Sequence, residues 1–232
     1  MSVLFPNGYK CLVCGKEIDS DKKISICDKC FNKLPKIKGK TCEICGEPVT
    51  SDSKVCVHCK KELPVFTKCF APYIYCDEIE NLVQGLKYRG KIYYARTIST
   101  LMLNCFLEQN IDIDVVVPVP MNLRREYERG FNQAELLMVA FSDVGYKTDS
   151  KILARSRNTA SQTHLNKTQR KANVSDAFVV TNKSKVKGKN ILIVDDVYTT
   201  GATMNAIAKV LKEAGAKNVY GVTFSHTVVG TK

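Results

Sequence analysis

The clearest chemistry in the chain lies in residues 191–203, which read ILIVDDVYTTGAT. An apolar run precedes two adjacent acids, Asp195 and Asp196, and hydroxyl side chains then surround Gly201. The apolar run predicts a strand buried on both faces of a parallel sheet, and such sheets bind ligands at the carboxyl ends of their strands. The two acids are therefore expected to face a ligand.

The residues after the acids predict a phosphate-binding turn. Apolar residues recur at helical spacing from residue 204 and indicate a helix that begins near Thr203. Free amides in its first turn, the positive end of the helix dipole and the flexibility of Gly201 suit a phosphate group, and the hydroxyls of Thr199 and Thr200 add donors. The acid pair suits ribose hydroxyls, directly or through Mg²⁺. A capped helix beside solvated acids explains any one feature but not the whole string, which predicts a site for a sugar 5-phosphate.

Metal binding is indicated by eight of the eleven cysteines, which form four Cys-x-x-Cys pairs between residues 11 and 59. This spacing suits zinc in a reducing compartment better than disulfides, and four thiolates complete one tetrahedral site. Two structural Zn²⁺ ions are therefore expected, with His58 at the surface. Pairing in sequence order uses the shorter loops, but an interleaved arrangement uses the same residues and stays open. The expected ligands are Cys11, Cys14, Cys27, Cys30, Cys42, Cys45, Cys56 and Cys59.

Composition divides the chain into two parts. Residues 1–65 lack a long helical period and have too little core of their own, which predicts a double Cys₄ zinc-finger module held by metal. Residues 66–232 alternate strands with helices, which predicts an α/β domain with a parallel sheet flanked by helices. The expected strands are 114–120, 190–196 and 218–224, and the expected helices are 77–90, 93–110, 131–145 and 203–216.

The chain is basic, with 35 Lys and Arg against 23 Asp and Glu and a formal charge of +12. Eight zinc-bound thiolates lower this charge to about +8. No stretch approaches the length of a membrane-spanning helix, and the N-terminal residues lack the pattern of a signal peptide. A cytoplasmic protein is therefore expected.

Several basic side chains follow the strand that ends near Pro120. Arg124, Arg125 and Arg129 are expected to reach the same sheet edge as the acids, where an arginine fork suits pyrophosphate, although a solvated charge run is the simpler alternative. Residues 151–175 carry six cations and no acid and predict a mobile loop, either a lid over phosphate or a nucleic-acid contact. His164 and His226 are weaker acid–base candidates.

The stretch IVDDVYTTGAT resembles the signature of type I phosphoribosyltransferases, which bind 5-phosphoribosyl-1-pyrophosphate (PRPP). Together with the double Cys-x-x-Cys module, three further stretches make nearly the whole chain resemble the ComF family. These stretches are GLKYRG, VPVPMNLRREYERGFNQA and RNTASQTHLNKTQRKANVSDAF.

The resemblance implies a type I phosphoribosyltransferase-like fold and a role for each motif. Asp195 and Asp196 would hold the ribose hydroxyls, and the loop after Pro118 would bind pyrophosphate beside Arg129. The active-site loop would contain Arg170, which is expected to stabilise developing charge, and the matching positions Gln162, Leu165 and Asn173. The residues implied for the 5-phosphate are Thr199, Thr200, Gly201, Ala202 and Thr203.

The resemblance also implies a role in natural competence, in which incoming single-stranded DNA is handled in the cytoplasm, with other competence proteins as partners at the uptake channel. Tyr88, Tyr127 and Phe131 lie near cations and could stack on bases, although core packing is the simpler expectation. The alternative function is an enzyme that transfers ribose 5-phosphate from Mg²⁺–PRPP to an unidentified base or amine. No acceptor site is recognisable in the sequence.

Overall fold

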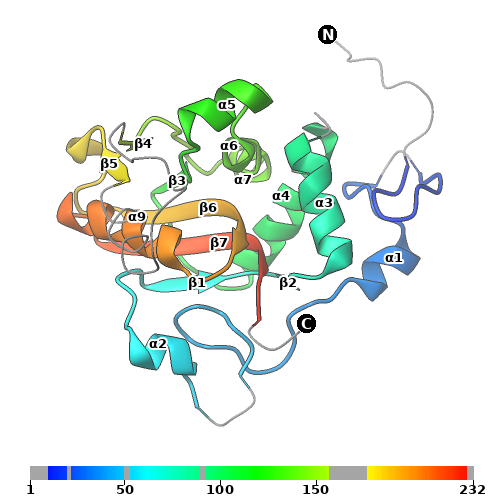
Figure 1. Ribbon diagram of the computed structural model, residues 1–232, viewed down its shortest axis with the longest axis horizontal. Coiled ribbons are helices and arrows are strands. Elements are labelled where there is room, and N and C mark those ends of the chain that lie inside the picture. The colour runs from blue at the N-terminus through cyan, green and yellow to red at the C-terminus, as the bar shows by residue number, and fades with distance from the viewer. Residues whose placement is uncertain (1–9, 20–21, 50–52, 89–91, 157–176, 229–232) are drawn as a thin grey trace, which may run out of the picture.

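The computed structural model describes residues 10–19, 22–49, 53–88, 92–156 and 177–228. The helices labelled in Figure 1 are α1 (Asp28–Lys33), α2 (Val57–Lys61), α3 (Asp77–Tyr88), α4 (Ile92–Leu107), α5 (Leu123–Arg129), α6 (Gln133–Leu136), α7 (Val139–Asp143) and α9 (Ala202–Glu213). The strands are β1 (Lys68–Phe70), β2 (Tyr73–Ile74), β3 (Val115–Pro118), β4 (Leu153–Arg155), β5 (Phe178–Val180), β6 (Asn190–Tyr198) and β7 (Asn218–His226). A 3₁₀ helix, η2 (Lys183–Lys185), lies between β5 and β6 in the chain.

The central sheet is parallel, in the order β1-β7-β6-β3, and β2 also pairs with β7. The β6–β7 register runs from Asn190 opposite Asn218 to Tyr198 opposite His226, so β6 continues past the acid pair instead of ending there. The three expected strands are present as β3, β6 and β7. The α/β fold predicted from the sequence is therefore confirmed.

Helices cover both faces of this sheet (Figure 1). Leu192 and Val194 of β6 pack in the same core cluster as residues of α3, α4 and α7. Ile191 and Ile193 point to the other face and pack with α9 and the β4–β5 pair. Because successive strand residues alternate between faces, a continuous apolar run is what a strand between two helical layers requires.

The predicted helix 131–145 is wrong in one respect, because the structure divides it into α6 and α7. Ser99 of α4 accounts for the division: its hydroxyl donates to the Leu137 carbonyl oxygen at 2.6 Å, and its oxygen accepts from the Ala140 amide at 3.0 Å. A side chain inserted into a helical hydrogen-bond ladder interrupts it. The charge run before it is also helical, as α5, with Asn122 capping the Arg124 amide at 3.0 Å.

A small antiparallel pair, β4–β5, lies outside the central sheet, with Arg155 opposite Phe178. The preceding chain runs beside β3, since the Val116 amide donates to the Lys147 carbonyl oxygen at 2.8 Å. Of the predicted loop 151–175, residues 153–155 form β4, and residues 157–175 lie outside the described part of the chain.

The cysteine module packs against the sheet domain. The Cys69 amide of β1 donates to the Ile44 carbonyl oxygen at 2.6 Å, and the Ser25 amide donates to Thr97 Oγ1 of α4 at 3.1 Å. Cys11 belongs to the core cluster of one sheet face, and Cys42 belongs to that of the other. Within the described residues, no helix is both long and apolar enough to cross a membrane.

Candidate functional site

The two acids lie near the carboxyl end of β6, which is the central strand between β7 and β3. Asp195 is partly exposed and pairs in register with Thr223, whereas Asp196 is 6% exposed. The Asp196 amide donates to Asp195 Oδ1 at 2.9 Å. Burial raises the pKa of Asp195 to about 8, and the negative charge of Asp196 adds to this effect. The ligand-free site therefore favours the protonated form of Asp195.

The turn after the acids has the geometry that the sequence indicates. Gly201 has φ of +75°, in the left-handed region, and serves as the N-cap of α9 without offering a side chain. Thr199, Thr200 and Ala202 are exposed, and the turn forms a small hollow with Asp195 and Thr223. Open amides at the start of a twelve-residue helix form a suitable place for a phosphate.

The acid pair is connected to two other segments by side-chain contacts. Lys87 Nζ at the end of α3 lies 2.6 Å from Asp196 Oδ2, and Gln133 Nε2 of α6 donates to the same oxygen at 3.4 Å. Gln133 in turn accepts from Arg129 Nη1 at 3.0 Å. Residues from GLKYRG, from RGFNQ and from IVDD therefore meet at one point, although they are far apart in the chain.

Lys87 is a residue of this site that the sequence analysis missed. Its side chain is 23% exposed and its ion pair with Asp196 is mostly shielded from water. The residue stands inside GLKYRG, so the motif marks the segment, but helical spacing alone does not show which side chain turns toward the acids. Only the packing of α3 against the sheet places it there.

The loop after β3 is held at the same sheet edge. The Val119 amide donates to the Val194 carbonyl oxygen at 3.0 Å, and Asn132 Nδ2 donates to the Val119 carbonyl oxygen at 3.0 Å. Arg129 is connected to Asp196 through Gln133 at this edge, and its role in binding stays a prediction. Arg124, by contrast, is exposed and forms an ion pair with Glu128 at 2.9 Å.

The predicted active-site loop and the predicted acid–base histidines have different outcomes. Arg170, Gln162, His164, Leu165 and Asn173 lie outside the described residues. His226 is 2% exposed, stacks on Tyr198 with ring centroids 4.4 Å apart and has Nδ1 2.8 Å from the Thr227 carbonyl oxygen. Burial lowers the pKa of His226 and favours the neutral ring. His226 is therefore a packed histidine at the end of β7.

The eight paired cysteines form two groups in sequence order, which decides between the two arrangements left open above. Within each group the sulfur atoms all lie within 4.8 Å of one another. Tetrahedral Zn–S bonds of about 2.3 Å place sulfurs about 3.8 Å apart. The Cys14–Cys27 and Cys45–Cys56 sulfur distances are 3.8 and 3.6 Å, so both groups fit zinc. We call Cys11, Cys14, Cys27 and Cys30 the first cluster and Cys42, Cys45, Cys56 and Cys59 the second cluster.

Backbone amides favour the thiolate at one cysteine of each cluster, Cys11 and Cys42, whereas burial raises the pKa of Cys30, Cys45, Cys56 and Cys59. Burial raises the pKa of Cys11, but amides including that of Cys27, 3.3 Å from the Cys11 sulfur, outweigh burial and lower the pKa to about 6. The same balance lowers the pKa of Cys42 to about 7. His58 is exposed, as expected, while Cys69 is buried and Cys76 and Cys105 are half-buried.

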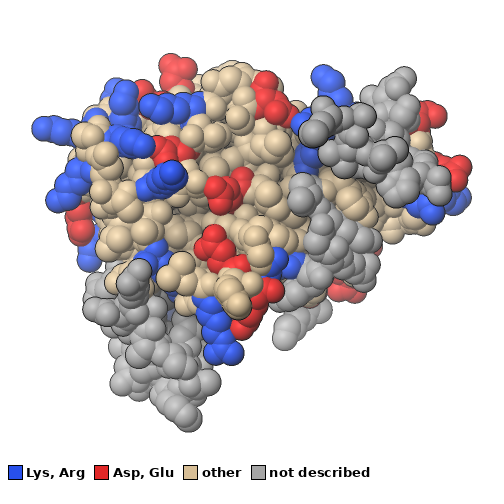
Figure 2. All heavy atoms as spheres, turned by 90° about the horizontal axis from the view of Figure 1, so that it is seen from above, with Lys and Arg blue, Asp and Glu red and all other residues tan. Residues whose placement is uncertain are grey.

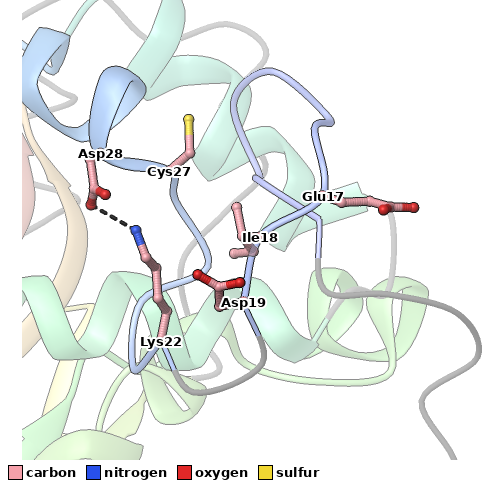
Figure 3. A pocket seen from close by; sticks show the side chains of 6 residues that line it. All are labelled: Glu17, Ile18, Asp19, Lys22, Cys27 and Asp28. Carbon is pink, nitrogen blue, oxygen red and sulfur yellow. Dashed lines mark hydrogen bonds and ion pairs between the residues drawn. The ribbon is translucent and has the colours of Figure 1, made fainter.

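A hollow beside the first cluster is lined by Glu17, Ile18, Asp19, Lys22, Cys27 and Asp28 (Figure 3). Lys22 Nζ forms an ion pair with Asp28 Oδ1 at 2.7 Å across one side of it. Asp28 is largely exposed, and surface ion pairs of this kind contribute little. The hollow is separate from the acid pair and the phosphate turn, so we assign no ligand to it.

Comparisons with known proteins agree with this arrangement. Residues 91–227 match the family model of the phosphoribosyl transferase domain, and residues 1–69 match that of the double zinc ribbon domain. The fold is thus that of a phosphoribosyltransferase domain that carries two zinc ribbons.

Curated relatives specify the family further. The chain is 34% identical over 170 residues to the DNA utilization protein YhgH of Salmonella typhi, covering 71% of this chain and 74% of the relative. It is 28% identical to competence protein F of Haemophilus influenzae, with 71% and 75% covered. It is 29% identical to competence protein ComFC of Bacillus subtilis, with 88% and 89% covered. The chain therefore belongs to the ComF family.

Proposed function

We propose that this protein binds PRPP together with Mg²⁺ at the carboxyl edge of its parallel sheet. The observation that carries the proposal is the placement of Asp195 and Asp196 immediately before an open turn that begins at Thr199 and caps α9 with Gly201. The acids would hold the ribose hydroxyls, and the turn would hold the 5-phosphate through its amides and hydroxyls. The residues proposed for the phosphate are Thr199, Thr200, Gly201, Ala202 and Thr203.

The pyrophosphate half of the ligand would lie over the loop after β3. Arg129 lies beside Asp196 through Gln133, and arginine suits pyrophosphate because its planar fork binds two oxygens. Arg170 is proposed to approach from the segment between β4 and β5 and to stabilise negative charge on the leaving group. A bound Mg²⁺ would neutralise part of the pyrophosphate charge.

The biological role that we propose is in natural competence, with incoming single-stranded DNA handled in the cytoplasm next to other competence proteins. The names of the relatives, competence protein and DNA utilization protein, support this role. Tyr127 of α5 is 91% exposed between arginines of the same helix, which suits base stacking next to backbone contacts. Figure 2 shows Lys and Arg side chains gathered on the end of the molecule that carries β4 and β5.

The alternative is a phosphoribosyltransferase that transfers ribose 5-phosphate to a base or an amine. Incubation with Mg²⁺–PRPP and a panel of bases, with pyrophosphate release as the readout, distinguishes a PRPP-binding protein from a transferase. We expect calorimetry to detect PRPP binding and the panel to give no release above that without protein. Base-dependent release would establish the enzyme instead, and absence of PRPP binding would overturn both.

The DNA role predicts a steep dependence on salt. Binding of a single-stranded oligonucleotide through backbone phosphates releases about 0.7 counterions per contact, so four contacts give a slope near −3 in a plot of log affinity against log salt. Fluorescence anisotropy of a labelled oligonucleotide between 50 and 200 mM salt measures this slope. A flat response, or no binding at low salt, would contradict the DNA role.

The variant Tyr127→Ala should weaken binding of the same oligonucleotide by about 5- to 100-fold, because stacking of the ring on a base is lost.

A further inference from the structure

The chain that follows β7 reaches the start of the phosphate turn. Strands β6 and β7 lie side by side in the sheet (Figure 1), and their register ends with Tyr198 opposite His226. Thr227 comes next, and its amide donates to the Tyr198 carbonyl oxygen at 2.9 Å. This bond extends the strand pairing by one step and brings the Thr227 side chain to the point where the turn begins.

The Thr227 hydroxyl contacts two consecutive carbonyl groups. Its Oγ1 atom lies 3.3 Å from the Tyr198 carbonyl oxygen and 3.3 Å from the Thr199 carbonyl oxygen. One hydroxyl hydrogen can be shared between two such acceptors in a three-centre hydrogen bond. Because β6 ends at Tyr198, the contact with Thr199 fixes backbone that the strand pairing does not reach.

The direction of these carbonyl groups sets the direction of the amides that follow them. In a planar trans peptide, the C=O of one residue and the N–H of the next point in opposite directions. With both carbonyl oxygens held at Thr227, the amides of Thr199 and Thr200 point away from β7. Within the described part of the chain, neither amide donates a hydrogen bond. Consecutive free amides that point the same way form a concave binding place for an anion.

Other contacts fix the backbone that carries Thr227. The His226 ring stacks on Tyr198 at a centroid distance of 4.4 Å, and its Nδ1 lies 2.8 Å from the Thr227 carbonyl oxygen. The Tyr75 amide, next to β2, donates to the His226 carbonyl oxygen at 2.9 Å. None of these contacts uses the Thr227 hydroxyl, so a variant that lacks only the hydroxyl should keep this end of β7 in place.

We propose that Thr227 is a positioning residue of the phosphate turn, whose hydroxyl orients the Thr199 and Thr200 amides to form the cradle for the 5-phosphate. It acts through the backbone of the turn and not by contact with the phosphate. The identity of the ligand rests on the proposed function, whereas the orientation of the amides does not. Residues 191–203 contain the turn but no part of β7, so their sequence does not point to Thr227.

Calorimetry with Thr227→Val tests this role in the full-length, zinc-loaded protein. Valine keeps the branched shape of threonine and removes only the hydroxyl. We expect the affinities for Mg²⁺–PRPP and for ribose 5-phosphate to fall about 3- to 10-fold, as expected for loss of one neutral hydrogen bond. Thr227→Ser retains the hydroxyl and should bind both probes within about twofold of the wild type. Wild-type affinities in Thr227→Val would overturn the proposal.

Thr181 is the matched control, because it has the same kind of contact at another strand end. It follows β5 directly, and its amide donates to the Ile152 carbonyl oxygen at 2.9 Å. Its hydroxyl also contacts two consecutive carbonyl oxygens, those of Lys151 and Ile152. The β4–β5 pair lies outside the central sheet, so Thr181→Val should change both affinities less than about twofold. Equal losses in Thr181→Val and Thr227→Val would overturn the proposal.

A measurement without ligand distinguishes failure of this inference from failure of the proposed function. Residual dipolar couplings of the Thr199 and Thr200 amides report the directions of their N–H bonds in the free protein. The couplings should change in Thr227→Val and remain at the wild-type values in Thr227→Ser and Thr181→Val. Unchanged couplings in Thr227→Val would overturn the role of Thr227, whatever the affinities. Changed couplings in a protein whose wild type binds neither probe would support that role and contradict the proposed function.

Discussion

Loss of zinc from the second cluster is expected to weaken PRPP binding strongly, whereas loss from the first cluster should leave it nearly intact. Tyr198 provides the physical connection, because it is 7% exposed and packs in the same core cluster as all four cysteines of the second cluster. Its hydroxyl lies so close to Gly201 that a Cβ there would collide with it. Burial raises the pKa of Tyr198, and nearby cysteine charges add to this, so the phenol stays neutral.

Two further contacts join the phosphate turn and α9 to residues that pack near the second cluster. Phe66 meets Tyr198 edge to face at a centroid distance of 6.4 Å, and the Val65 amide donates to Asn205 Oδ1 of α9 at 2.6 Å. Among the described residues, the first cluster makes no comparable contact with the phosphate turn, because it packs toward α3 and α4 on the other face of the sheet. The two zinc ribbons are similar in sequence, but only the second supports the proposed site.

A pair of cysteine variants tests this difference. Cys59→Ser in the second cluster should lower the affinity for Mg²⁺–PRPP more than about 10-fold in calorimetry, and Cys14→Ser in the first should change it less than about threefold. Metal analysis verifies that each variant loses one zinc. Hydrogen exchange of the amides at residues 199–205 gives a second readout without ligand and should accelerate in Cys59→Ser only. Equal effects of the two variants on affinity and exchange would disprove the connection.

The parts of this molecule that could be predicted are those encoded by local spacing. The apolar run before Asp195 and the turn at Gly201 specify a strand, a ligand edge and a helix start within thirteen residues. Cys-x-x-Cys spacing likewise specifies two metal sites, and loop length favoured the pairing that the structure has. In each case one short segment contains both the signal and the chemistry.

The parts that could not be predicted depend on contacts between distant segments. Ser99 interrupts the helix between Leu137 and Ala140 from a different helix, and no pattern within residues 131–145 indicates it. Lys87 contacts Asp196 from more than a hundred residues away in the chain. Arg155 packs on the Phe178 ring because β4 pairs with β5, across a long interval of the chain. Helical and strand periodicity predict which face of an element is buried, but not which polar group meets another.

The site also shows how burial and charge are balanced around adjacent carboxylates. Lys87 Nζ lies 2.6 Å from Asp196 Oδ2, so the nearly buried carboxylate has a cationic partner. Asp195 has no ion pair among the described residues, and burial raises its pKa to about 8, which favours the protonated form. A ligand that needs both carboxylates charged must therefore displace a proton from Asp195. Such a site is built for binding at the expense of stability.

Replacing both acids, Asp195→Asn with Asp196→Asn, should lower the affinity for Mg²⁺–PRPP at least about 100-fold while the protein stays folded. Two charge-assisted interactions with the ligand are lost, each contributing about 1.5–3 kcal/mol. Calorimetry measures the affinity, and circular dichroism together with zinc content verifies the fold. Asp112→Asn is the control, because Asp112 is an exposed aspartate away from the sheet edge. Unchanged PRPP affinity in the double variant would remove the assignment of this site.

The single variant Asp195→Asn should raise the melting temperature of the ligand-free protein, and the gain should grow with pH. The pKa of Asp195 is raised from its ordinary value of 3.8 to about 8 in the folded state, so the folded protein binds more protons than the unfolded chain between these values. Stability contributed by the protonated form is complete below about pH 4 and is lost as pH rises through 8. Asn cannot ionise and avoids this loss.

Thermal melts at pH 5, 6, 7, 8 and 9 test this dependence. A gain of about 1–2 kcal/mol corresponds to about 2–8 °C for a chain of this size, and it should increase up to pH 8 and then level off. Because zinc loss at low pH affects wild type and variant alike, the difference between them isolates Asp195. A melting temperature that falls in Asp195→Asn would show that the ionised carboxylate stabilises the fold, contrary to the burial that raises its pKa.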